Sequence, residues 1–193
     1  MKQILTLLLT ISLLSSCDEG KRKYTPSNSE VEKDLNAIEF VKKQDTIYNY
    51  WELILYTIYD RKDFKIFNKN YSLEIKTFSL NDSLIVRNLG EGEQVYLDHS
   101  HTRVTDFKLF TDSLIDQKRI DKTDFKKALI PEFYSECNLY STAIDSIIGN
   151  IVYLTSDLAV PDTDNQWRVW FSIEVKNNKL GKLEIRKTDY VGL

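Results

Sequence analysis

The sequence contains few of the residues from which disulfides and catalytic sites are usually built. Among 193 residues it has two cysteines and two histidines. A nucleophile-elbow pattern, a glycine-rich phosphate loop and a histidine-based triad with a suitable serine are all missing from it. We therefore expect a protein without enzymatic activity and without a cofactor.

The sequence also lacks an excess of basic residues and a long apolar run. Lys and Arg number 26 against 29 Asp and Glu, which gives a formal net charge of −3. Nucleic-acid binding requires a clustered basic face, so we expect no nucleic-acid partner. The apolar run at residues 4–14 is about 11 residues long, whereas a transmembrane helix needs about 20.

The amino terminus has the layout of a bacterial lipoprotein signal. A lysine precedes the apolar residues 4–14, and two serines come directly before Cys17. A positive start, a short apolar core and small residues before the cleavage site are typical of a secretory signal. The tetrad Leu-Ser-Ser-Cys at residues 14–17 resembles a lipobox, which directs acylation of the cysteine. We expect Cys17 to carry lipid such as palmitate; the alternative is an ordinary signal peptide that contains a cysteine.

Lipid attachment at Cys17 predicts a resident of the cell envelope, periplasmic or surface-exposed, whose partner is a membrane. Each buried methylene contributes about 0.8 kcal/mol, and two or more acyl chains give stable anchoring. Asp18 and Glu19 resemble an inner-membrane retention signal of enteric bacteria and also a surface-export signal of Bacteroidetes, so the leaflet stays open. With Cys17 acylated, Cys137 has no disulfide partner, and we interpret it as a small buried side chain.

Three segments are expected: a signal peptide at 1–16, a lipidated cysteine and flexible tether at 17–28, and one β-rich globular domain at 29–193. The domain begins with Ser29 and Glu32, which fit a capping box. Apolar residues at helical spacing follow, and they predict an amphipathic helix that covers a sheet, or alternatively one that binds a membrane or partner. These residues are Val31, Leu35, Ile38 and Val41.

Most of the remaining chain alternates with a period of two, which predicts strands. Gly149-Asn150 suits a type II′ hairpin turn, and Asn81-Asp82 suits another tight turn, after which 83–88 is expected to pair with 71–77. We expect an α+β fold: a β-rich single domain of antiparallel hairpins with one or two short covering helices. Expected strands are 48–59 (or a helix), 71–77, 83–88, 103–110, 113–119, 142–148, 151–156, 167–176 and 182–187, with a helix at 123–130 and a loop at 89–102.

Several segments in this order resemble a family of uncharacterised Bacteroidetes lipoproteins, catalogued as a domain of unknown function. The likeness covers roughly residues 65–187 and includes the lipobox. It implies a single β-rich domain outside the cytoplasm and supplies no activity. The matching segments are Asn-Tyr-Ser-Leu at 70–73, Leu-Asn-Asp-Ser at 80–83, Ile-Asp-Lys-Thr-Asp-Phe at 120–125 and Pro-Asp-Thr-Asp at 161–164.

Two segments have the residue types of metal sites. His99 and His101 would share one face of a strand and could bind a metal with Asp98 or Asp106, although a solvated loop is the alternative. Asp162 and Asp164 space oxygen ligands as an irregular calcium loop does, or else form a turn. An EF-hand is excluded because Trp167 occupies the position of its glycine.

Trp170 is a candidate binding residue. If Trp167 and Phe171 face the core, Trp170 faces away from it, where it could stack on a sugar or anchor a protein; a covering helix is the alternative. The first hypothesis is thus a membrane-anchored, non-enzymatic binding domain for a glycan or an envelope protein. The alternatives are an envelope hydrolase or metal-dependent enzyme with a site assembled from distant residues, and a structural accessory lipoprotein of a larger complex.

Overall fold

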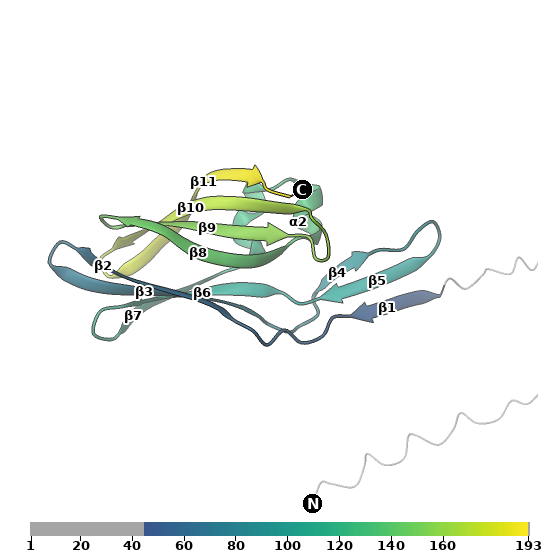
Figure 1. The fold of residues 1–193 in the computed structure, drawn as a ribbon, viewed down its shortest axis with the longest axis horizontal. Helices are drawn as coiled ribbons and strands as arrows, with labels where there is room; N and C mark the ends of the chain where they lie inside the picture. The colour runs from purple at the N-terminus through teal and green to yellow at the C-terminus, as the bar shows by residue number, and fades with distance from the viewer. Residues whose placement is uncertain (1–44, 193) are drawn as a thin grey trace, which may run out of the picture. The chain divides into compact units, whose positions relative to one another are not determined.

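Two four-stranded antiparallel sheets form the body of the domain in the computed structural model, which describes residues 45–192 (Figure 1). The first sheet has the order β2-β3-β6-β7 and the second has the order β11-β10-β9-β8. The first contains β2 (Ile58–Ile66), β3 (Lys69–Ser79), β6 (Arg103–Phe110) and β7 (Leu114–Ile120). The second contains β8 (Asn138–Ile148), β9 (Ile151–Ala159), β10 (Gln166–Lys176) and β11 (Lys179–Tyr190).

A third, smaller sheet lies at one end of the two large ones, on the right in Figure 1. Its order is β1 (Thr46–Tyr50), β5 (Val95–Ser100) and β4 (Ile85–Asn88), and β1 runs parallel to β5. The chain between β1 and β2, residues 51–57, has no regular structure. No helix among residues 45–192 combines the length and apolar character needed to cross a membrane.

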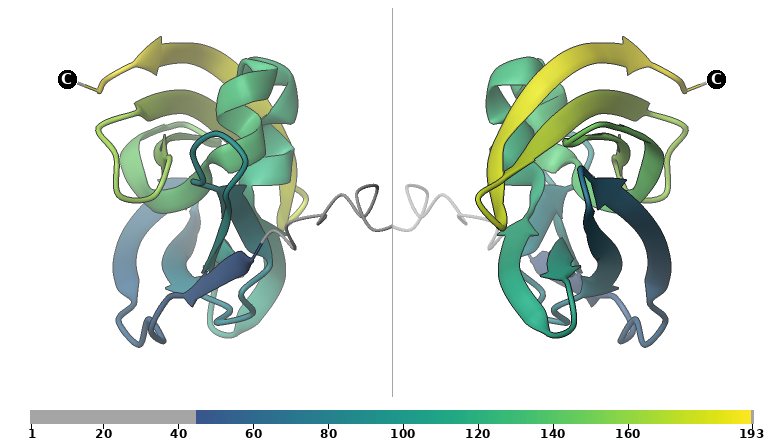
Figure 2. Two further views of the ribbon diagram at one scale, coloured as in Figure 1. Left: turned by 90° about the vertical axis from the view of Figure 1, so that its right-hand side faces the viewer. Right: turned by 90° about the vertical axis from the view of Figure 1, so that its left-hand side faces the viewer.

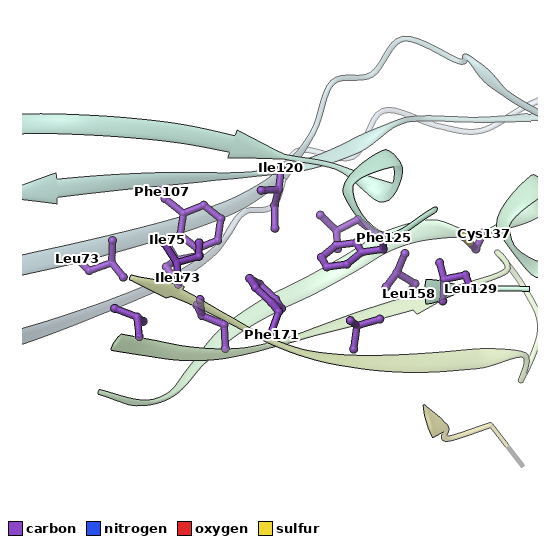
Figure 3. Close-up of a cluster of buried hydrophobic side chains, with 14 of the residues drawn as sticks. Leu73, Ile75, Phe107, Ile120, Phe125, Leu129, Cys137, Leu158, Phe171 and Ile173 are labelled. Carbon is purple, nitrogen blue, oxygen red and sulfur yellow. The ribbon is translucent and has the colours of Figure 1, made fainter. Parts of the chain in front are cut away.

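The core lies between the two large sheets, whose inward side chains come from alternate strand positions (Figure 3). On β10, Val169, Phe171 and Ile173 are buried, and across from them lie Leu73 and Phe107 of the first sheet. Burial of each such side chain contributes roughly 1.5–3 kcal/mol. Figure 2 shows the two sheets end on, with their edges curving toward each other.

Side chains also join the edges of the two sheets. Asp60 on β2 accepts a hydrogen bond from the backbone N–H of Ile144 on β8 at 3.1 Å. At the other edge Asp116 on β7 accepts from the N–H of Leu180 on β11 at 2.7 Å. These carboxylates satisfy edge donors that would otherwise be open to pairing with another chain.

Two short helical segments, η1 (Lys122–Ala128, a 3-10 helix) and α2 (Pro131–Glu136), connect the sheets. Asp121 caps η1 through a capping box with Asp124, and Pro131 starts α2, where its missing N–H costs nothing. Phe125 of η1 packs edge-on against Phe171 in the core. The helices therefore close one end of the core.

The prediction of a β-rich domain with antiparallel sheets and few helices is confirmed, and four local predictions need correction. The expected strand at 48–59 is two strands separated by residues 51–57, and the expected loop at 89–102 contains β5. The helix expected at 123–130 is a 3-10 helix that ends at Ala128, and a second helix, α2, starts at Pro131. The strands on either side of Asn81-Asp82 do not pair with each other, because β3 pairs with β2 and β6 whereas β4 pairs with β5. The cleavage site, Cys17, the tether and the helix after Ser29 lie outside the described residues.

Candidate functional site

Three two-residue hairpin turns surround a cavity of about 970 Å³ at the end of the sandwich away from the third sheet. These turns are Phe67-Asn68 between β2 and β3, Gly149-Asn150 between β8 and β9, and Asn177-Asn178 between β10 and β11. They lie on the left in Figure 1 and face the viewer in the right-hand view of Figure 2. We call this site the turn-end cavity.

The turn residues follow from the backbone angles that tight hairpins need. Asn177 and Asn178 have φ of 51° and 60°, the left-handed pair of a type I′ turn, which asparagine tolerates. Gly149 has φ of 61° while Asn150 does not have a positive φ, as in a type II′ turn. The hairpin expected from Gly149-Asn150 is confirmed.

Phe67 does not fit its turn in the same way. Its φ is 51°, a conformation that bulky residues rarely adopt, and its side chain is 96% exposed at the lip of the cavity. Such a conformation costs on the order of 1–3 kcal/mol, and full exposure of an aromatic ring adds no core packing. Strained residues of this kind concentrate at ligand-binding sites.

The cavity is lined by cations and amides. Lys65, Lys69 and Lys176 contribute three ammonium groups, and Glu174 is the one acidic side chain among the lining residues. Glu174 accepts a hydrogen bond from the amide of Asn150 at 2.9 Å. The site therefore has an excess of positive charge, and the pair of carboxylates that glycoside hydrolysis uses is missing from its described lining.

One bonded group connects the two sheets at the cavity wall. The Tyr71 hydroxyl and the Lys69 ammonium both donate to Oδ1 of Asn178, at 2.8 and 3.0 Å. The Lys69 Nζ also lies 5.5 Å from the centroid of the Tyr71 ring. Phe64 stacks on the Tyr71 ring, with the two ring centroids 5.6 Å apart. These contacts fix the position of an aromatic face and a cation side by side.

Asparagine amides, ammonium groups and an exposed aromatic ring together suit a sugar that carries acidic groups. The amides can bond to hydroxyls, the lysines can pair with carboxylates, and an aromatic face can stack on the apolar face of a sugar ring. None of these groups is a nucleophile next to a base.

The predicted metal residues His99 and His101 have other contacts. His101 is buried, accepts a hydrogen bond from the backbone N–H of Ser83 at Nδ1 (3.1 Å), and lies 3.1 Å from the carbonyl of Glu52 at Nε2. His99 stacks on Tyr50, with ring centroids 4.5 Å apart. Within residues 45–192 no three His, Cys, Asp or Glu side chains are placed to share a metal ion.

The two aspartates expected to join these histidines are paired with arginines instead. Asp98 is buried and accepts from Arg87 at 2.6 Å, and it also accepts from Asn49 and Trp51. Asp106 pairs with Arg119 at the surface. Burial would raise the pKa of Asp98, but the hydrogen bonds from its three neighbours and the charge of Arg87 outweigh it and hold the pKa below its usual value.

The predicted calcium loop forms a turn that is closed by Thr163. Its hydroxyl donates to the carbonyl of Val160 at 2.9 Å and accepts from the N–H of Asn165 at 3.1 Å. Asp162 and Asp164 are exposed. The segment is thus a turn whose hydrogen bonds come from the threonine and not, as expected, from the aspartates.

Trp170 lies on the outer face of the second sheet, as predicted from its place directly before the inward-facing Phe171 in the strand. It is half-buried, and the Lys187 Nζ lies 4.8 Å from its ring centroid. The 123–130 segment packs through Phe125 on the opposite face of β10, so it does not cover Trp170. Cys137 is fully buried in the core, and burial raises the pKa of its thiol to about 11.

The buried guanidinium of Arg103 was not anticipated. It lies between the rings of Tyr56 and Tyr140, 5.0 Å from each centroid, and donates to the Tyr56 hydroxyl at 2.9 Å. It forms no ion pair within the described chain, and its Nε and Nη2 are enclosed without a partner. It therefore offers no donor to a ligand in this arrangement.

The turn-end cavity could not be recognised from single motifs because its residues come from three distant hairpins. The one local signal was the Phe67-Asn68 pair between two alternating segments, where a phenylalanine occupies a position that favours glycine or asparagine. No protein-family model matches the chain, and a search of curated proteins finds no match to it either.

Proposed function

We propose that the protein is a non-enzymatic binding domain of the bacterial cell envelope, anchored by lipid at Cys17, that takes an acidic oligosaccharide in the turn-end cavity. The lipobox at residues 14–17 supports the anchor and the location. The lining of three lysines and several asparagines supports an anionic, hydroxyl-rich ligand.

The observation that carries the proposal is the state of Phe67. An aromatic ring that is 96% exposed, held at a strained φ at the lip of a cavity, contributes little to folding. The structure around it would be more stable with glycine there. A role in stacking on a ligand explains why phenylalanine occupies this turn.

Titration calorimetry of the full chain tests the proposal, with a hexamer of galacturonic acid as the probe and a neutral galactose hexamer as its control. We expect the acidic hexamer to bind more tightly and to lose affinity as salt rises, because ammonium–carboxylate attraction is screened. Phe67→Ala should weaken binding by about tenfold or more, as loss of an aromatic anchor does. Leu89→Ala, at an exposed residue outside the cavity, is the matched control and should leave binding unchanged.

Two results would contradict the proposal. One is equal affinity for the acidic and neutral hexamers, including no affinity for either. The other is unchanged affinity in the Phe67→Ala protein. The anchor is tested separately by labelling with palmitate, which should mark the wild-type chain and leave Cys17→Ser unmarked.

A further inference from the structure

Exposed apolar side chains gather at the end of the domain opposite the turn-end cavity. Leu55 is 83% exposed, Leu84 is 73% exposed and Leu53 is 66% exposed, and three tyrosines next to them are more than half exposed. Soluble monomers rarely expose a large contiguous apolar patch unless it binds something. We call this patch the apolar surface and define it by Tyr48, Tyr50, Leu53, Leu55, Tyr56 and Leu84.

The apolar surface is formed by one face of the third sheet and the chain that follows it. Tyr50 lies opposite His99 on β5, which in turn lies opposite Val86 on β4, so all three share the outer face of that sheet. The other face carries Asp98 and Arg87, which are both buried. Alternation along the strands therefore puts the polar network inside and the aromatic rings outside.

Specific hydrogen bonds hold the exposed residues 51–57 in place. The side chain of Asn81 accepts from the N–H of Ile54 at 2.9 Å and donates to its carbonyl at 3.2 Å. The carbonyl of Glu52 lies 3.1 Å from the His101 ring. The fold therefore holds Leu53 and Leu55 in exposed positions, because the backbone of Glu52 is bonded to His101 and the backbone of Ile54 is bonded to Asn81.

We infer that the apolar surface docks on the lipid bilayer to which the chain is anchored, an inference that rests on the proposed lipid at Cys17. Residues 18–44 join Cys17 to the described domain, and 27 residues span at most about 95 Å even when fully extended. The described domain begins at β1, which carries Tyr48 and Tyr50. The apolar surface therefore includes the end of the domain that is closest to the anchor along the chain.

The charges near the apolar surface indicate whether a lipid bilayer or a second copy of the chain docks there. Residues 45–57 contain Asp45 and Glu52 and no lysine or arginine. A symmetric contact between two copies would bring these like charges together, which disfavours a second copy. Tyrosine and leucine suit the interface of a zwitterionic bilayer, where the ring hydroxyls reach the headgroups and the leucines reach the acyl chains.

Docking in this way orients the binding site. The hairpin turns of the turn-end cavity and the third sheet lie at opposite ends of the domain in Figure 1. With the apolar surface on the bilayer, the cavity opens away from the membrane. An anchored domain would then present its ligand site to the space beyond the headgroups.

Spin labels on the lipidated full-length protein in phosphatidylcholine vesicles test the inference. Leu55→Cys carries the test label, and Ile148→Cys carries the control label, since Ile148 is exposed at the turn end. Cys137 is buried with a raised pKa, so it does not compete for the reagent. We expect the label at 55 to lie about 5–10 Å below the headgroups and the label at 148 to stay in water. Added phosphatidylglycerol should not deepen the label at 55.

Each other outcome has a distinct meaning. A label at 55 that stays in water on vesicle-bound protein overturns docking and leaves the anchor intact. A label at 55 that is immobilised but inaccessible to lipid, or that couples to a second label, identifies a protein partner or a second copy and also overturns docking. Absence of lipid at Cys17 refutes the proposed anchor, and docking is then judged from the sedimentation of the Cys17→Ser protein with vesicles. Docking predicts that Cys17→Ser sediments with the vesicles and that the added changes Leu53→Ser and Leu55→Ser abolish this sedimentation. Docking is refuted if Cys17→Ser does not sediment with the vesicles.

Discussion

The hydroxyl of Tyr71 donates to Oδ1 of Asn178 at 2.8 Å and thereby links β3 of the first sheet to the β10–β11 turn of the second. The two residues are 107 positions apart in the chain. Because both line the turn-end cavity, the bond couples the width of the cavity to the packing of the two sheets. Folding and the geometry of the proposed site therefore depend on the same contact.

Replacing Tyr71 with phenylalanine tests this link. Tyr71→Phe should lower the free energy of unfolding by about 1 kcal/mol, because a part-buried acceptor loses one of its donors. Tyr153→Phe is the control, since the Tyr153 hydroxyl makes no hydrogen bond within the described chain. Urea denaturation of both variants measures the difference, and equal stability of the two would contradict the role of the bond.

Phe67 should lower the stability of the protein and raise its affinity for the ligand. Phe67→Gly is expected to raise the free energy of unfolding by up to about 1 kcal/mol, because glycine adopts a positive φ without strain. The same variant should lose affinity for the acidic hexamer. Asn177→Gly is the control for the backbone effect, since asparagine already tolerates its φ of 51° and should gain less. A destabilised Phe67→Gly protein would show that the ring supports the fold.

The buried pair of Arg87 and Asp98 should dominate the stability of the third sheet. Asp98→Asn leaves a buried guanidinium without its counter-charge, and breaking such a pair costs about 3–5 kcal/mol. Asp106→Asn breaks a pair with an exposed arginine and should cost less than about 1 kcal/mol. Thermal or urea unfolding distinguishes them, and equal effects would contradict the account.

The same carboxyl predicts sensitivity to acid. The pKa of Asp98 in the folded protein lies below its ordinary value of 3.8, so the unfolded chain takes up its proton first as the pH falls. The stabilising contribution is complete above pH 3.8 and is lost as the pH falls through the folded pKa. The difference in the free energy of unfolding between wild type and Asp98→Asn should therefore decrease only below that pH. A difference that already decreases nearer neutrality would contradict the lowered pKa of Asp98.

Cys137 predicts the opposite dependence at high pH. Burial raises the pKa of its thiol from 9.0 to about 11, so the folded state keeps the proton that the unfolded state releases. Stability should fall between these two pH values, by at most about 1.4 kcal/mol per pH unit, and Cys137→Ala should remove this part of the slope. Iodoacetamide at pH 8 should modify the thiol only in denaturant; rapid alkylation of folded protein would show that Cys137 is accessible.

The strands could be predicted where one face is buried and the other is not. On β10, Val169, Phe171 and Ile173 alternate with polar residues, and the expected range of 167–176 matches the strand closely. On β8 and β9 the Gly149-Asn150 turn fixed the register. Local alternation and turn chemistry decide such hairpins, so sequence alone sufficed.

The third sheet could not be predicted because its pattern depends on distant partners. Asp98 and His99 sit in the middle of β5, where a buried aspartate is tolerated only because Arg87 and Asn49 pair with it. The same holds for the site: the candidates with recognisable chemistry, His99 and Asp162, lie apart from the cavity. The sequence offered only the Phe67-Asn68 pair as a signal, and the strain that distinguishes Phe67 lies in its backbone angle.

The central claim, that the turn-end cavity takes an acidic oligosaccharide, is tested most directly by titrating isotope-labelled protein with the galacturonic acid hexamer and following its amide resonances. The account predicts saturable shifts confined to residues 65–71, 149–150 and 174–178, which come from three separate hairpins and meet only at this cavity. Shifts centred on Trp170 or His99 instead, or no shifts at millimolar hexamer, would contradict it.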